Sequence, residues 1–270
     1  RAARLQKGEL CAVDSTSRSA YGNTLTDVKW GKNKDKLPLE QTMETVVYTL
    51  DSHMPVYYRA FPGNIPDSRS VETILTDIRH AGFPHVILIT DRGYESLQNL
   101  ERYILAGQAM IMCVKVRQKM VLEKIREFGD FGGRPPVMEI DPKSKLYHKQ
   151  YDLEYPVTGK GGSTTQSDRL RLNLYFDAIR RGTELTALDV NIAMQRAALQ
   201  EIKEMGASLD DDVTIKRNYN YFDIDYNESD RTIRSFTLNE EKVAAARRTS
   251  GFFAIMTHKL DMDPITALDN

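Results

Sequence analysis

Two apolar runs in the sequence each end in an aspartate. Leu10 to Val13 precede Asp14 in "LCAVDSTS", and the run at 86–90 precedes Asp91 in "HVILITDRGY". Carboxylate oxygens suit Mg²⁺, which usually keeps some waters and also bridges substrate phosphates. A pair of such ions about 3.5–4 Å apart can stabilise the attacking and leaving oxygens of phosphodiester chemistry. The pattern indicates a candidate metal site; the alternative is that both aspartates cap turns or helices, as at many strand ends.

The elements expected around these aspartates would bring them to one edge of a sheet. The first 115 residues predict the order β-β-β-α-β-α-β, with strands at 9–17, 43–51, 55–64, 85–91 and 109–114. The first, fourth and fifth runs are continuously apolar, which is typical of central parallel strands covered on both faces. Open α/β sheets place their sites at the carboxyl ends of such strands, so Asp14 and Asp91 should lie close enough to share a ligand.

Two helices are expected between these strands. Apolar residues at i, i+3, i+4 and i+7 from Val71 predict a helix that ends at Gly82. The second helix is expected to carry Leu97 and Ile104 on its buried stripe, with Gly107 just past its end. Both helices would cover the sheet that carries the aspartates.

The composition and periodicity of the sequence change after the fifth predicted strand. The stretches "GDFGGRPP" and "VTGKGGSTTQSD" are loops by composition, and Thr183 is expected to cap a helix that ends at Gly206. The segments "YNYFDIDYN" and "RTIRSFTLN" predict a strand pair, and "GFFAIMTH" returns to the pattern of a buried strand. We therefore predict a core over 1–115, a mixed α+β insertion over 116–248, and a return to the core over 249–270.

The amino-acid composition limits the classes of protein to which the chain can belong. With 270 residues, 41% hydrophobic and 28% charged, the chain is typical of a globular protein. No apolar run approaches the roughly 18 residues that span a bilayer, so no membrane partner is expected. Cys11 and Cys113, the only cysteines, lie inside apolar runs, which fits a reducing cytoplasm. The net charge of −1 gives no global signal for nucleic acid, so a polyanion would have to be held by local basic patches or metal ions.

One such patch is the stretch "KWGKNKDK" at 29–36. It interleaves Trp30, the sole tryptophan, with Lys29, Lys32, Lys34 and Lys36. Lysines beside an aromatic platform can follow a DNA backbone, although a solvated hairpin tip has the same composition. The basic strand at 169–181 is a second candidate surface for DNA.

Five motifs in order resemble a known family. The stretches "VDSTSRSAYG", "GKNKDKLPLEQ", "YRAFPGNIPD", "LITDRGY" and "TSGFFAIMTH" follow one another as in bacterial insertion-sequence DDE transposases of the IS-four-like group. The resemblance covers most of the chain and is best over 9–115 and 231–260. It implies an RNase H-like α/β core, a mixed sheet flanked by helices and interrupted by an insertion.

The resemblance also implies roles for the two aspartates. Asp14 resembles the first catalytic aspartate of the family and Asp91 the second. Together they would hold Mg²⁺ or Mn²⁺, with two ions in the complete enzyme. The third carboxylate of the family is a glutamate in a Tyr-x2-Arg-x3-Glu-x6-Lys signature, and no tyrosine here has arginine three residues on. Asp263 and Pro264 are expected to begin the helix that carries it, which places the glutamate beyond Asn270 and makes the chain a fragment.

Four further residues resemble family positions near the site. Asn64 and Asp67 match a polar pair in the family's "GN..D" segment, or else cap the helix at 70–79. Arg92 is a candidate phosphate contact or support for the site, or a structural ion-pair partner. Tyr94 is expected to pack behind the site rather than take part in its chemistry.

The implied function is DNA transposition by metal-dependent strand cleavage and strand transfer. The partners would be transposon ends and target DNA, and full-length relatives work as homodimers or larger assemblies on DNA. The expected location is the bacterial cytoplasm, at the nucleoid when bound. Three alternatives stay open: a hydrolytic nuclease on the same fold, a non-catalytic DNA-binding remnant, and an unrelated α/β domain.

Overall fold

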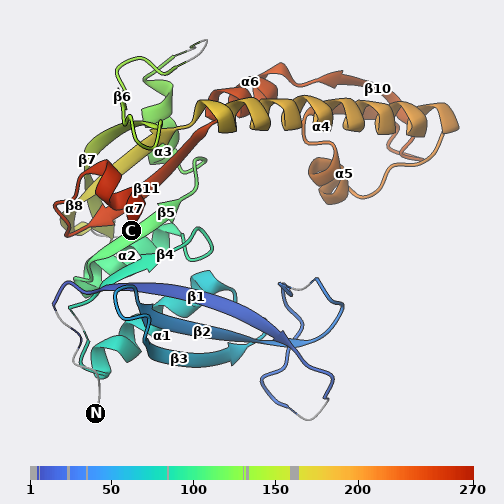
Figure 1. Cartoon of the computed structure of the whole chain (residues 1–270). Helices are drawn as coiled ribbons and strands as arrows, with labels where there is room; N and C mark the ends of the chain where they lie inside the picture. The colour runs from blue at the N-terminus through green and yellow to red at the C-terminus, as the bar shows by residue number, and fades with distance from the viewer. Residues whose placement is uncertain are drawn as a thin grey trace.

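The computed structural model describes residues 5, 7–22, 25–34, 36–83, 85–129, 131, 134–158 and 164–270. Most of its strands form one nine-stranded mixed sheet (Figure 1). In spatial order these are β3 (Pro55–Pro62), β2 (Gln41–Thr49), β1 (Leu10–Ser19), β4 (Ile87–Thr90), β5 (Met110–Val114), β11 (Phe252–His258), β8 (Thr164–Phe176), β7 (Tyr147–Thr158) and β6 (Glu139–Ile140).

The first five strands form the half of the sheet that the sequence predicts. β2 pairs antiparallel with β1 and β3, whereas β4 pairs parallel with both β1 and β5. The apolar runs of β1, β4 and β5 are therefore the central parallel strands, as predicted. This mixed sheet with flanking helices confirms the α/β class and the RNase H-like order of the core.

Helices α1 (Asp67–His80) and α2 (Leu97–Ala106) share one hydrophobic core with the inward face of β1. Gly107 ends α2 in the left-handed conformation, as predicted. The prediction for Leu97 is wrong: it is the first residue of α2 and is 49% exposed. The buried stripe of α2 begins at Asn99 and continues through Leu100, Tyr103 and Ile104.

A second hydrophobic cluster covers the opposite face of the sheet. It joins Ile87 and Ile89 of β4 to Ile255 of β11, and Met262 and Leu268 pack against it. Leu268 lies in the short helix α7 (Pro264–Asp269), which Asp263 caps by accepting hydrogen bonds from the backbone N–H groups of residues 265 and 266. The predicted start of a helix at Asp263 and Pro264 is thus confirmed.

Strands β7 and β8 occupy much of a stretch that composition assigns to a loop. β7 runs to Thr158 and β8 begins at Thr164, so only residues 159–163 of "VTGKGGSTTQSD" fall between them, and these lie outside the described residues. The glycines of this stretch favour a loop prediction, although Val157 and the threonines belong to the two strands of the hairpin. Because β8 pairs with β11, both strands belong to the main sheet although they fall within 116–248.

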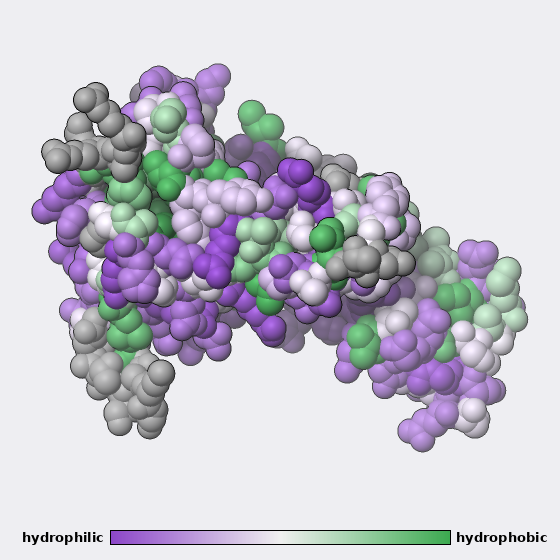
Figure 2. Space-filling model, turned by 90° about the horizontal axis from the view of Figure 1, so that it is seen from below, coloured by the Kyte–Doolittle hydropathy of each residue, from purple (hydrophilic) through white to green (hydrophobic). Residues whose placement is uncertain are grey.

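The rest of 116–248 consists largely of one helix and a separate arm. The helix, α3 (Lys119–Arg126), contributes buried side chains to the main hydrophobic core. The arm consists of α4 (Ala178–Met205), α5 (Asp212–Asn218), β9 (Phe222–Tyr226), β10 (Ile233–Leu238) and α6 (Glu240–Thr249). It has its own hydrophobic cluster and extends away from the sheet (Figures 1 and 2). The predicted pairing of β9 with β10 is confirmed. α4 begins before Thr183, because Asp177 accepts hydrogen bonds from the N–H groups of Ile179 and Arg180.

In the part of the chain that the structure describes, no helix has the length and apolar character needed to span a bilayer.

A buried histidine fastens β11 to its neighbours. The ring nitrogens of His258 lie 2.8 Å from the carbonyl oxygen of Gln108 and 2.9 Å from Oδ2 of Asp168. Burial raises the pKa of Asp168, but the hydrogen bonds from His258 and the Arg169 N–H and the nearby positive charges outweigh it, so the pKa is lowered. A lowered pKa in the folded state stabilises the fold above the ordinary value of 3.8, and this contribution is lost as the pH falls through the folded-state pKa.

We therefore expect Asp168→Asn to reduce the free energy of unfolding by about 1–2 kcal/mol at neutral pH, because the acceptor for His258 becomes a neutral amide in place of a charged carboxylate. The difference from the original chain should shrink as the pH falls below about 4, where Asp168 is protonated first in the unfolded state and then, below its lowered pKa, in the folded state as well. Urea unfolding at several pH values measures it, with Asp51→Asn in an exposed turn as the control. A difference that stays constant with pH would contradict the ionic role.

Candidate active site

Asp14 and Asp91 lie side by side at one edge of the sheet. Val13 of β1 and Thr90 of β4 are partners in the parallel register; Asp14 follows Val13 within β1, and Asp91 is the first residue after β4. Neighbouring strands lie about 4.8 Å apart, and alternation places Asp14 with Leu10 and Asp91 with Ile89 on the same face. Both aspartates are exposed to solvent. The two carboxylates are thus adjacent and accessible, as the sequence pattern predicts.

Backbone N–H groups hold each carboxylate in place. The N–H of Ser15 donates to Oδ1 of Asp14 over 2.7 Å, and the N–H of Gly93 donates to Oδ1 of Asp91 over 2.7 Å. The aspartates are therefore oriented by the chain around them, and neither forms an ion pair among the described residues.

Asp67 approaches the same edge from α1. Its Oδ1 accepts a 2.6 Å hydrogen bond from the hydroxyl of Ser15, whose N–H holds Asp14. A side-chain carbon on Gly93 would lie 2.9 Å from Oδ1 of Asp91 and 3.0 Å from Oδ2 of Asp67. Asp67 and Asp91 thus flank Gly93, and only glycine leaves the gap between them open. Ser15 and Gly93 link all three carboxylates.

The helix-cap interpretation of Asn64 and Asp67 is wrong. Pro66 is the N-cap residue of α1, and no side chain accepts a hydrogen bond there. Asp67 is already inside the first turn, where its negative charge favours the helix N-terminus. Asn64 is exposed and lines a cavity of about 260 Å³ together with Lys32, Lys34, Asp67 and Gly93. The polar pair therefore belongs to the surroundings of the aspartates.

Tyr94 and Arg92 follow Asp91 but point to different environments. Tyr94 is 1% exposed, and burial raises the pKa of its hydroxyl, an effect that nearby Ser15 and Thr45 oppose. It packs behind the site, as the sequence predicts. Arg92 is exposed; burial raises the pKa of the Cys113 thiol, an effect that the charge of Arg92 opposes and that of Asp91 adds to. Arg92 thus lies at the solvent side of the same edge.

The basic stretch 29–36 lies against the first strands instead of forming a free hairpin tip. Lys29 exchanges two 3.0 Å backbone hydrogen bonds with Gln41 at the start of β2. The N–H of Lys34 donates to the hydroxyl of Ser17 over 2.8 Å. The ammonium of Lys34 donates to the carbonyl and, over 3.0 Å, to the hydroxyl of Ser15. Lys34 therefore reaches the network of the carboxylates.

The tryptophan and the other lysines of the stretch face solvent. Trp30 is 64% exposed, and Lys29, Lys32 and Lys36 are also exposed. They offer cations and an aromatic surface to solvent, and Lys32 also lines the cavity beside Asp67. The composition that indicated a DNA contact therefore lies within the same region as the two aspartates.

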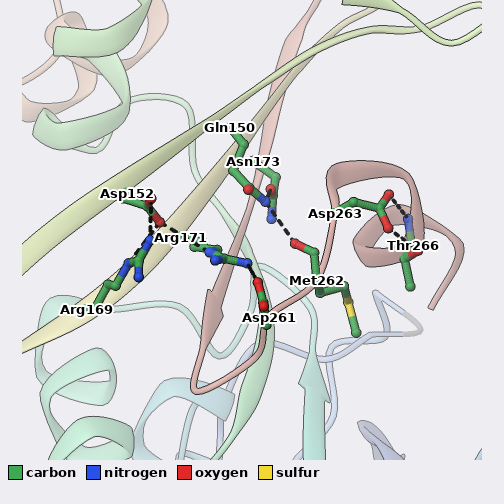
Figure 3. Close-up of polar contacts among 9 residues, drawn as sticks. All are labelled: Gln150, Asp152, Arg169, Arg171, Asn173, Asp261, Met262, Asp263 and Thr266. Atoms are coloured by element: carbon green, nitrogen blue, oxygen red, sulfur yellow. Dashed lines mark hydrogen bonds and ion pairs between the residues drawn. The ribbon is translucent and has the colours of Figure 1, made fainter.

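The second basic surface is largely neutralised. Arg169 and Arg171 both contact Asp152, with Arg169 at 2.5 Å and Arg171 at 3.2 Å, and Arg171 also pairs with Asp261 (Figure 3). Nearby, Gln150 donates to the carbonyl oxygen of Met262 over 2.9 Å. These contacts fasten the segment before α7 to β7 and β8. The arginines of β8 thus have a structural role that the sequence did not indicate.

The donor set at the sheet edge fits a hard divalent cation. Asp14 and Asp91 present carboxylate oxygens only, the ligand type that Mg²⁺ and Mn²⁺ prefer over histidine or thiolate. Within the described residues, no group of three or more His, Cys, Asp or Glu side chains is arranged to hold a metal. The two aspartates would therefore supply part of a coordination shell and require a further ligand.

Comparison with known proteins identifies the family. The family model of the transposase DDE domain matches residues 5–208. No curated protein matches the sequence significantly. Two solved structures are similar at low TM-scores. The cryo-EM structure of the piggyBac transposase synaptic complex with hairpin DNA gives a TM-score of 0.35 at 10% identity, over 54% of this chain and 31% of that chain. The catalytic domain of human endonuclease V gives 0.24 at 14% identity, over 60% and 62%.

The chain thus spans less than two thirds of the length of either solved structure. The family match, by contrast, covers well over half of this chain and includes Asp14, Asp67 and Asp91. On that match, the chain belongs to the transposase DDE domain family.

Proposed function

We propose that this chain supplies two catalytic aspartates, Asp14 and Asp91, to a DNA transposase that cuts DNA and joins the freed end to a target. The observation that carries the proposal is their position in a chain of this family. Each follows one member of the paired residues Val13 and Thr90, on neighbouring parallel strands. Open α/β sheets hold their sites at this edge.

DDE transposases generally use divalent metal ions. We propose Mg²⁺ or Mn²⁺, two ions in the complete enzyme, held by Asp14, Asp91 and a third carboxylate. When bound, such ions activate the attacking oxygen and stabilise the leaving one. The chain itself fixes its carboxylates through the N–H groups of Ser15 and Gly93.

The reaction class is phosphodiester hydrolysis followed by transesterification. Water attacks the phosphorus at a transposon end, and the bond to the 3′ oxygen breaks to free a 3′-OH. That hydroxyl then attacks a target phosphodiester and displaces another 3′ oxygen, so one bond forms for each bond broken. Arg92, exposed beside Asp91, is placed to contact a phosphate. Asp67 and Asn64 support the site from the side of α1, and Tyr94 packs behind it.

The proposed partners are transposon ends and target DNA, and the proposed enzyme works as a homodimer or larger assembly on DNA. We expect it in the bacterial cytoplasm, at the nucleoid when bound. The exposed members of the basic stretch, Lys29, Trp30, Lys32 and Lys36, would contact the DNA backbone. Lys34 would contribute less, because its ammonium already contacts Ser15.

Lys32 and Lys34 should therefore differ in how much each contributes to DNA binding. Lys32→Gln should reduce the slope of log affinity against log salt by about one for duplex DNA, because one phosphate contact is lost. Lys34→Gln should change the slope by less than half as much. Fluorescence anisotropy over a salt series measures both, and equal effects of the two variants would contradict the division.

The test of the proposed function is strand joining. The full-length protein is incubated with Mg²⁺ or Mn²⁺, a pre-cut labelled transposon end and a target plasmid. Transfer of label to the plasmid supports a transposase. Cleavage of uncut DNA without joining would point to a hydrolytic nuclease. DNA binding with neither reaction would point to a non-catalytic remnant.

A further inference from the structure

The long helix α4 has apolar residues on two faces, but the arm covers only one of them. Leu188, Ile192 and Leu199 are buried in the cluster of the arm. The opposite face carries exposed, uncharged side chains: Ile179, Thr186, Val190, Ala193, Met194 and Ala197. At 1.5 Å per residue this face is about 27 Å long. Within 179–197, all of it described, the charged residues of α4 lie off this face.

The exposed face is an unusual one for a solvated helix. Val190 is 53% exposed and Met194 is 67% exposed, although a helix with apolar residues all round is normally buried. Beside this face lies a groove of about 660 Å³, to which Ala193 and Ala197 of α4 and Phe236 of β10 contribute. A contiguous apolar surface of this kind marks an interaction site.

The charges beside the groove indicate what covers it. Asp189 and Arg196 both line the groove and, seven residues apart, lie on the same flank of α4. If a second α4 packs antiparallel about a two-fold axis between residues 192 and 193, Asp189 of each helix faces Arg196 of the other. The small Ala193 at the axis allows the helices to approach closely. The surface is therefore complementary to itself.

We propose that this face of α4 and its groove form a homodimer interface, occupied by α4 of a second copy in antiparallel orientation. DNA fits the face less well, because the charges that line the groove are of both signs and Asp189 would repel a phosphate. Asp189 also contacts Arg247 over 3.0 Å, but its side chain is 61% exposed and can accept a second partner. The inference rests on the pairing of subunits within the proposed function, and not on the chemistry at Asp14 and Asp91.

Sedimentation velocity of the 270-residue chain without DNA or metal tests the interface. We expect a reversible monomer–dimer equilibrium. Met194→Glu should raise the dissociation constant by about a hundredfold, because each dimer would bury the new charge twice. Val213→Glu is the matched control, since Val213 is 76% exposed on α5 and lies off this face. Circular dichroism checks that both variants remain folded.

Charge reversal tests the orientation. Asp189→Arg or Arg196→Asp alone should raise the dissociation constant about tenfold, since each creates two like-charge contacts. The double variant should restore dimerisation. A chain that is monomeric at every concentration, or a Met194→Glu variant that dimerises normally, would overturn the interface. If both single variants dimerise more weakly and the double variant does not regain dimerisation, the antiparallel arrangement is overturned.

A separate variant distinguishes this inference from the proposed function. Asp91→Asn should dimerise like the original chain, because Asp91 lies on the main sheet and the interface lies on the arm. Loss of catalysis with intact dimerisation would leave the interface supported. Loss of dimerisation in Met194→Glu with an intact Asp91 site would leave the catalytic proposal supported.

Discussion

Asp91→Asn should reduce metal-dependent DNA cleavage by the full-length protein at least about a thousandfold. Loss of a carboxylate that holds the metal removes several kcal/mol of transition-state stabilisation, and each 1.36 kcal/mol is a factor of ten in rate. The fold should be unaffected, because the side-chain oxygen of asparagine can still accept the hydrogen bond from the N–H of Gly93. Gel analysis of a labelled transposon end measures cleavage.

The same substitution can also be tested by measuring metal and DNA binding instead of catalysis. The 270-residue chain with Asp91→Asn should bind Mn²⁺ more weakly than the original, by isothermal titration or electron paramagnetic resonance. Its affinity for DNA should stay nearly unchanged, because the proposed DNA contacts lie in the basic stretch. Asp51→Asn, in an exposed turn, is the control for removing one negative charge. Full cleavage activity in Asp91→Asn would rule out the proposed role of this carboxylate.

The first half of the fold could be predicted because its signals are local. The apolar runs of β1, β4 and β5 are short, bounded by turns and uninterrupted by charge, so they identify buried parallel strands directly. Gly107 could be placed because a left-handed residue at a helix end favours glycine. Leu97 was misplaced because its spacing from Leu100 fits a stripe, but the helix begins at Leu97 itself.

The second half could not be predicted in the same way because its pairing is non-local. β8 lies between β7 and β11, whose sequences are far apart, so its membership of the main sheet depends on contacts that no window of sequence contains. The start of α4 was missed because the predicted strand was carried on to residue 181, whereas β8 ends at Phe176 and the side chain of Asp177 caps the helix.

The candidate site likewise has one feature that local sequence signals predict and others that depend on non-local contacts. The adjacency of Asp14 and Asp91 follows from strand order and from the edge at which parallel strands end. The linking role of Ser15 does not, because its partner Asp67 lies 52 residues away. One signal was available: Ser15 is a polar residue on the inward face of β1, where a buried hydroxyl requires a partner. The position of Lys34 beside Ser15 had no comparable signal.

The second large effect should come from a glycine that places the basic stretch against the site. A side-chain carbon on Gly63 would lie 1.9 Å from the carbonyl oxygen of Gln41 and 2.6 Å from that of Lys29. Both are backbone atoms held by the hydrogen bonds between Lys29 and Gln41, so neither can turn aside. We expect Gly63→Ala to lower the free energy of unfolding by about 3 kcal/mol, at the upper end of the usual cost of overpacking.

The displacement should also be detectable locally and in function. Trp30, the only tryptophan, lies between Lys29 and Gly31, so its fluorescence should change in Gly63→Ala before global unfolding in urea. DNA affinity should fall as well, because Lys32 would move with the segment. Gly182→Ala is the matched control: nothing lies within 4 Å of the added carbon inside α4, and alanine there should stabilise the chain by about 0.5–1 kcal/mol. If Gly63→Ala unfolds like the original chain and leaves Trp30 unchanged, the close packing of residues 29–31 on Gly63 and Gln41 cannot be what holds the basic stretch beside the aspartates.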